Sequence, residues 1–339
     1  MKLFLALLSS GIFAFAQEVR PLNFEELLSV VRTNLTDISE EELSRLAAQG
    51  LIKELGTKVQ LVTNNASAPI LPDEVISRRA TYNDAYGYIQ IRSVDDRLPD
   101  AFQKWVSGLN TNSIKGLIID LRYAQGDSYT AAAQVADQFA KAGEPLLKTG
   151  TNQITATEKT KIDFPIAVLA NRDTRGAAEA LAALVRETGA GLVIGSPTAG
   201  EARLFETFTL STGQQLKVGT VPIEVGTKKL PSKGLTPDLA VTVNPSSEKI
   251  FYQDPFRTIS PLTGQVVVST NEVTAAGTNR ARRFNEAELV RRHRTGASLD
   301  EPGGSIDGGP DQPIINDPVL ARALDFLKGI SALQQHRPQ

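Results

Sequence analysis

The 339-residue chain is 41% hydrophobic and 22% charged, the balance of an ordinary globular protein. Its formal net charge of −2 gives no general attraction to nucleic acid, so we expect no nucleic-acid partner. The sequence has no cysteine, which excludes disulfides and thiolate chemistry. It has only two histidines, His293 and His336, so we expect no metal site.

The first 16 residues have the three parts of a secretory signal. Lys2 supplies a positive charge, residues 3–13 are apolar, and Ala14-Phe15-Ala16 forms a small-x-small cleavage site. The apolar run is shorter than the roughly 20 residues that a helix needs to cross a bilayer. We therefore expect residues 1–16 to be removed. The mature chain is then exported to the periplasm or cell envelope of a bacterium, with no further transmembrane segment, because export without disulfides fits that compartment.

Two helices are predicted within residues 17–80, which we expect to form a small N-terminal helical unit and a linker. Asn23 begins the first helix, over residues 23–35, and Ser39 begins the second, over residues 39–55. Each of these N-cap residues is followed three positions later by a glutamate, the pattern of a capping box. A short strand, VQLVT, comes after the second helix.

Strands and helices then alternate over residues 81–245, which we expect to form the core. This alternation predicts an α/β fold with parallel strand pairing. A hairpin is predicted to turn at Ser211-Thr212-Gly213. The predicted strands cover residues 85–94, 115–122, 165–170 and 191–195, and the predicted helices cover residues 97–109, 128–140 and 176–189.

Residues 246–339 are expected to form a C-terminal extension. Residues 294–317 are rich in glycine, proline and aspartate, which predicts a flexible loop or linker. Asp317 and Pro318 then begin a final helix, as N-cap and first helical residue. Leucines along one side of this helix give it an apolar face that must pack against the core.

Four motifs follow one another along the core. They are KGLIIDLR with YAQGD (115–127), NRDTRGAAE (171–179), GSPTAGEARLF (195–205) and SKGLTPDLAV (232–241). In this order and at these separations they resemble the C-terminal-processing, or tail-specific, serine protease family. The resemblance covers residues 86–243. It implies the α/β superhelix of stacked ββα units that crotonases and Clp-type proteases share.

That family uses a serine nucleophile, a lysine general base and a glutamine that orients the lysine. In this sequence the three positions fall on Gly176, Glu201 and Phe205. Glycine has no side chain that could form an acyl-enzyme. The resemblance therefore implies a degenerate catalytic site, in which the backbone at Gly126 and Ala177 is a vestige of the oxyanion site. The flanking positions Asn171, Thr174, Glu179, Gly195, Thr198 and Gly200 match the family, whereas Tyr123, Ala124, Gln125 and Asp127 depart from its NNPGG pattern.

We expect a non-catalytic pseudoprotease that binds a peptide or an unfolded protein segment, or another envelope protein, and that needs no cofactor. Strand edges beside Gly176 would accept an extended chain by β-augmentation. Many family members carry a PDZ domain before the core. Here only about 20 residues separate the VQLVT strand from the strand at Tyr86, which is too few for a domain.

Two alternatives remain open. An active peptidase would need a relocated nucleophile, Thr174 or Ser196, with a base such as Lys228, Lys229 or Lys233. An acyl-CoA enzyme on the same superfold is the other alternative, and the expected export argues against it because that cofactor is not expected outside the cytoplasm.

Overall fold

The computed structural model describes residues 22–35, 37–62, 74–109, 113–157, 162–259 and 314–335. The chain divides into two compact units, residues 1–56 and 57–339. Several expected features lie outside the described residues: the signal peptide at 1–16, residues 294–313 of the predicted flexible loop, and both histidines, His293 and His336.

The N-terminal unit contains the two predicted helices, α1 (Phe24–Asn34) and α2 (Glu40–Leu55). The carboxamide oxygen of Asn23 accepts the first N–H groups of α1, and the hydroxyl of Ser39 accepts the N–H of Glu42 at 3.2 Å. These side chains satisfy backbone donors that have no partner within a helix, so both predicted caps are confirmed. No described residue of either helix is buried.

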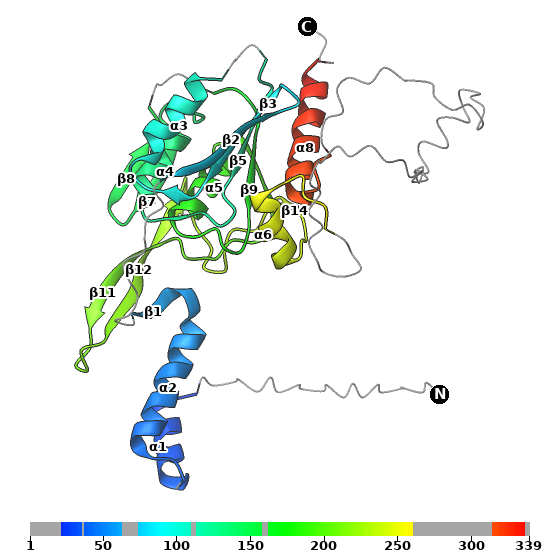
Figure 1. Cartoon of the computed structure of the whole chain (residues 1–339). Coiled ribbons are helices and arrows are strands. Elements are labelled where there is room, and N and C mark those ends of the chain that lie inside the picture. The colour runs from blue at the N-terminus through cyan, green and yellow to red at the C-terminus, as the bar shows by residue number, and fades with distance from the viewer. Residues whose placement is uncertain are drawn as a thin grey trace, which may run out of the picture. The chain divides into compact units, whose positions relative to one another are not determined.

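The larger unit is built on a six-stranded sheet with the order β14-β10-β9-β5-β3-β2 (Figure 1). Neighbouring strands are parallel except for the antiparallel pair β2–β3. Strands of this sheet that follow one another along the chain lie side by side in space. This is the arrangement expected from alternating strands and helices. The strands are β2 (Ile76–Tyr82), β3 (Tyr86–Ile91), β5 (Gly116–Asp120), β9 (Ile166–Ala170), β10 (Gly191–Gly195) and β14 (Leu239–Ala240).

Helices cover both faces of this sheet. Helices α3 (Leu98–Ser107), α4 (Tyr129–Ala136) and α5 (Ala177–Glu187) pack on one face, and α8 (Pro318–Gln335) packs on the other (Figure 1). Successive side chains of a strand point to opposite faces. In β5, Leu117 and Ile119 accordingly join the core under α3–α5, whereas Ile118 joins the core under α8. The continuous apolar run of this strand therefore reflects burial on both faces, as predicted.

An outer sheet of six strands carries the predicted hairpin, which extends away from the central sheet in Figure 1. The hairpin is formed by β11 (Arg203–Thr209) and β12 (Gln215–Val225). A separate two-stranded parallel pair joins β4 (Ser93–Val94) to β6 (Gln125–Gly126). The other strands of the outer sheet are β1 (Val59–Val62), β7 (Pro145–Thr149), β8 (Asn152–Thr155) and β13 (Lys228–Lys229).

The C-terminal helix α8 is held by a buried group of charges. Asp317 caps the helix, because its Oδ1 accepts the N–H groups of Val319 at 3.0 Å and Leu320 at 3.2 Å. The same carboxylate pairs with the fully buried Arg122 at 2.8 Å, and Arg122 also pairs with Asp120 at 2.7 Å. The predicted cap is confirmed, and it also links α8 to the DLR motif that follows β5.

Candidate functional site

Gly176, where the motif spacing predicts the family nucleophile, lies where the turn after β9 enters α5. Its backbone φ of +59° is in the left-handed region that favours glycine. A β-carbon there would collide with the carbonyl oxygen of Gly126. Gly126 is itself packed against the backbone of Val94 in the β4–β6 pair, so closely that a β-carbon would not fit there either. Position 176 therefore has no space for a side chain.

Glu179 joins the segments on either side of this position. Its Oε1 accepts the N–H groups of Gly176 at 3.1 Å and Glu201 at 2.7 Å. Its Oε2 accepts the hydroxyl of Thr198 at 2.5 Å and the N–H of Gly200 at 2.7 Å. Because Gly176 and Glu201 donate to the same oxygen atom, the structure brings these two positions together. Burial raises the pKa of the Glu179 carboxyl, and these hydrogen bonds oppose that shift.

Glu201, where the motif spacing predicts the family lysine, forms an ion pair. Its Oε1 lies 2.5 Å from Nη1 of Arg175, the residue that directly precedes Gly176. Arg175 also pairs with Asp173 at 3.1 Å. The position expected for a cationic base thus carries a carboxylate, which is already bound to a cation of the nucleophile motif.

Phe205, where the motif spacing predicts the family glutamine, lies in β11 at an irregularity of the strand register. It is paired with Gly219 of β12, and its ring lies close to that glycine. An apolar ring cannot orient a base by hydrogen bonding, so the third position also lacks its chemistry.

The two substitute nucleophiles have different surroundings. Thr174 is completely buried, and its hydroxyl donates to the carbonyl of Leu121 at 2.8 Å and accepts the N–H of Asn171 at 3.0 Å. Ser196 is partly exposed after β10, and its N–H donates to the carbonyl of Ala170 at 3.1 Å. The Thr174 hydroxyl therefore holds the turn before Gly176 in place, a structural role.

The three lysines considered as substitute bases, Lys228, Lys229 and Lys233, are all exposed. The ammonium group of Lys228 lies 2.9 Å from the carboxylate of Glu187. A lysine becomes a general base when burial or a neighbouring cation disfavours its charged form. None of these three is buried.

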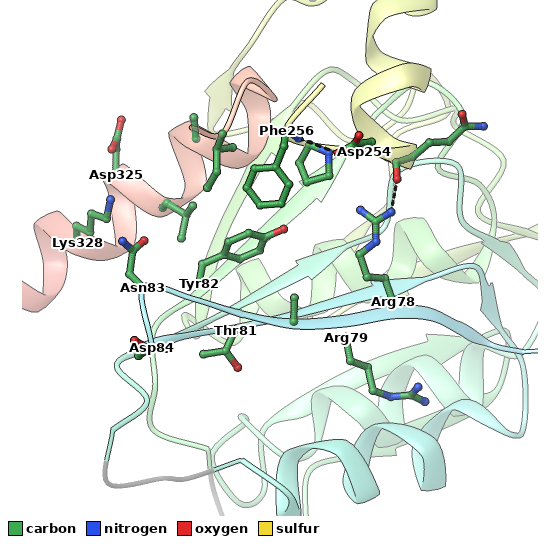
Figure 2. Close-up of a pocket in the computed structure, with 16 residues that line it drawn as sticks. Arg78, Arg79, Thr81, Tyr82, Asn83, Asp84, Asp254, Phe256, Asp325 and Lys328 are labelled. Carbon is green, nitrogen blue, oxygen red and sulfur yellow. Dashed lines mark hydrogen bonds between the residues drawn. The ribbon is translucent and has the colours of Figure 1, made fainter. Parts of the chain in front are cut away.

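A pocket of about 910 Å³ lies between β2, the chain after α6 (Pro245–Gln253) and α8 (Figure 2). The rings of Tyr82 and Phe256, 6.4 Å apart, form part of its wall. None of its lining residues belongs to the four motifs. Its charged residues have both signs: Arg78, Arg79, Lys328, Asp84, Asp254 and Asp325.

A pocket of about 500 Å³ borders the loop after β5. This loop contains the YAQGD motif, whose Gly126 contacts Gly176. The pocket, unlike the one in Figure 2, is therefore next to the motifs. It is lined by Arg92, Tyr123, Gln125, Lys249, Tyr252 and Gln253.

Comparison with known families agrees with the motifs. The model of peptidase family S41 matches residues 85–241, the segment that contains all four. Residues 85–241 form a peptidase family S41 domain. The chain is 27% identical over 165 residues to carboxyl-terminal-processing peptidase 2 of the chloroplast in Arabidopsis thaliana, a match that covers 45% of this chain and 31% of that protein. It is 26% identical over 218 residues to the carboxy-terminal processing protease CtpA of Bacillus subtilis. This match covers 60% of this chain and 46% of CtpA.

The fold of this chain is also found among solved structures. A crystal structure of a proposed peptidase from Parabacteroides merdae superposes on this chain with a TM-score of 0.51 and 17% sequence identity. The superposition covers 71% of this chain and 87% of the Parabacteroides chain. The α/β fold implied by the resemblance is confirmed. The curated relatives are longer than the matched region, since the matches to them cover between 31% and 46% of their length.

The motifs did not reveal every residue of the site. Arg175, between Thr174 and Gly176, does not match the family motif. Its ion-pair partner Glu201 is distant in sequence. Opposite charges at these two positions were a signal that could have predicted their pairing. The pocket residues Lys249 and Tyr252 lie on α6, a helix that the sequence pattern did not predict.

Proposed function

We propose that this protein is a catalytically inactive member of peptidase family S41 that binds a peptide or an unfolded protein segment. The observation that carries the proposal is the geometry at Gly176. The left-handed backbone and the carbonyl oxygen of Gly126 leave no space for a serine there. Thus both the nucleophile and the room for one are missing.

The surroundings of Gly176 also oppose an oxyanion. A tetrahedral intermediate is stabilised by N–H groups directed at its negative oxygen. Here a hydrogen-bond acceptor, the carbonyl of Gly126, faces the nucleophile position, and the N–H of Gly176 donates to Glu179. The carboxylate of Glu201 would further repel negative charge.

Edge strand β11 supports a binding role. Among the described strands, β11 pairs only with β12, so its other edge has no strand beside it. The strand begins at Arg203, two residues after Glu201. An extended peptide paired with this edge would gain main-chain hydrogen bonds and pass close to the former catalytic positions.

Export is part of the same proposal. The charged, apolar and small-x-small segments of residues 1–16 support removal of a signal peptide and a location in the bacterial envelope. In the described residues, no helix combines the length and apolar character needed to cross a membrane. Fractionation followed by N-terminal sequencing tests this part, and we expect the mature chain to begin at Gln17.

The decisive experiment measures cleavage and binding together. The mature protein is incubated with fluorescently labelled, unfolded casein, with fluorescence anisotropy reporting binding and mass spectrometry reporting new termini. Thr174→Ala and Ser196→Ala proteins are treated identically, and Bacillus subtilis CtpA is the positive control for cleavage. We expect binding without cleavage. Cleavage by the wild type that one alanine abolishes would establish a relocated nucleophile and overturn the inactive assignment.

A further inference from the structure

The pocket of about 500 Å³ beside the YAQGD loop lies at the carboxyl ends of two parallel strands. Arg92 directly follows β3, whereas Tyr123 and Gln125 follow β5. Helix α6 closes the pocket with Lys249 and Tyr252. In open α/β sheets, ligands bind outside the carboxyl ends of the strands, so the pocket has a typical location for a ligand site.

Tyr123 adopts an unusual conformation in this pocket. Its φ of +60° is in the left-handed region, which is strained for a residue other than glycine. The carboxamide oxygen of Asn171 accepts the Tyr123 N–H at 3.1 Å, and the Tyr123 ring meets the ring of Tyr252 edge-on, with centroids 4.9 Å apart. The surrounding structure thus holds the Tyr123 ring against the wall of the pocket.

The pocket offers hydrogen-bond donors and positive charge. Its lining residues are two cations, two phenols and two carboxamides, and none is a carboxylate. Burial raises the pKa of Tyr123 and of Tyr252 to about 12, so both hydroxyls keep their protons at neutral pH. In the part of the chain that the structure describes, neither Arg92 nor Lys249 belongs to an ion pair. Glu248, the neighbour of Lys249, is buried and interacts with Arg122.

From this chemistry we infer that the pocket binds a carboxylate group of a bound peptide. The inference rests on the proposed peptide-binding function and adds the group that is recognised. Two cations that form no ion pair with any described residue, together with neutral donors around a small concave space, match an anionic acceptor. The tyrosine rings offer an apolar surface for the adjoining side chain. The carboxylate belongs either to the peptide's C-terminus or to an acidic side chain, and these two sources can be separated by experiment.

Two features connect the pocket with the site around Gly176. Gln125 is followed in the chain by Gly126, whose carbonyl contacts Gly176. Tyr123 and Gln125 are also two of the positions that depart from the family motif. The loop that contacts Gly176 therefore also forms part of the wall of this pocket.

The test uses fluorescein-labelled hexapeptide libraries and the mature protein. One library has free C-termini and no Asp or Glu, the second has the same sequences as carboxamides, and the third is a carboxamide library with one fixed Glu. Anisotropy is compared for the wild type, for the double variant Arg92→Gln/Lys249→Gln, and for the control Arg79→Gln/Lys328→Gln. The control removes the same charge from the pocket of Figure 2.

We expect the first or the third library to bind at least about tenfold more tightly than the second. We expect this preference to disappear in the Arg92/Lys249 variant and to persist in the control. Preference for the first library identifies the C-terminus as the source, and preference for the third identifies a side chain. Equal binding of all three libraries, or a preference that survives in the Arg92/Lys249 variant, would refute the pocket inference while peptide binding stands. Absence of binding by every library would refute peptide binding itself.

Discussion

The carbonyl oxygen of Gly126 occupies the space that a β-carbon at Gly176 would need. These glycines belong to different motifs, one after β5 and the other before α5, and they meet because β5 and β9 are adjacent parallel strands. Replacement of Gly176 alone therefore cannot place a serine side chain here without a collision. The backbone of at least one of the two loops would have to move first.

A serine introduced at position 176 should destabilise the protein without giving it peptidase activity. We expect Gly176→Ser to lose more stability than Gly143→Ser, since Gly143 has φ of +79° but a β-carbon placed there would have no atom within 4 Å. The control therefore measures backbone strain of about 1–3 kcal/mol, and the difference between the variants measures the collision with Gly126. Urea unfolding gives both free energies. Casein cleavage by Gly176→Ser, alone or with Glu201→Lys, would contradict this prediction.

Removal of the Glu179 charge should loosen the segments that meet at this carboxylate. In Glu179→Gln an amide group faces four donors, and each donor left unpaired costs roughly 1–3 kcal/mol. Hydrogen exchange should become faster at the amides of Gly176, Gly200 and Glu201. Glu187→Gln on the same helix is the matched control, because its partner Lys228 is an exposed side chain. Unchanged exchange at these three amides would show that Glu179 is not their anchor.

The C-terminal helix should depend on the buried charges beneath it. Asp317→Ala removes the cap of α8 and one of the two partners of the buried Arg122, for which we expect a loss of about 3 kcal/mol in unfolding free energy. Asp325→Ala is the control, since this aspartate lies on the same helix and is exposed. Urea unfolding compares the two variants. Equal stability would mean that Asp317 does not anchor the helix.

The sequence predicted much of the central fold because burial leaves a clear pattern. The apolar run of β5 and the caps at Asn23 and Ser39 depend on short-range rules, and the structure agrees with them. Strand β2 was not predicted and was assigned to the linker. It is an edge strand of sequence ISRRATY, in which polar side chains alternate with buried or half-buried ones. The sequence pattern also does not predict the short outer strands β7 and β8 or helix α6. Few of their residues are fully buried, so they leave only a weak apolar pattern.

The site was only partly predictable for a different reason. Motif spacing assigns the three family positions to Gly176, Glu201 and Phe205, and that assignment stays a prediction. The ion pair between Arg175 and Glu201 and the contact of Tyr123 with Tyr252 join segments from different motifs or from outside them. Their distances depend on side-chain packing in three dimensions. The left-handed conformation of Tyr123 likewise has no signature in the sequence, because tyrosine rarely adopts it.

Glu248 should give the folded protein a characteristic pH dependence. Burial raises the pKa of its carboxyl above the usual 4.5, against the opposing effects of Asn171 and Arg122. The folded state therefore keeps this proton to a higher pH than the unfolded state does. The contribution of Glu248 to stability is consequently greatest below pH 4.5 and declines as pH rises through the raised folded pKa.

Glu248→Gln cannot titrate, so its unfolding free energy should decline less than that of the wild type over the same rise in pH. Urea unfolding from acidic to neutral pH measures both slopes. Lys249→Gln is the control for disturbance of helix α6, because it retains the Glu248 carboxyl and should keep the wild-type slope. If Glu248→Gln followed the wild-type curve at every pH, the burial of Glu248 would not be coupled to its protonation.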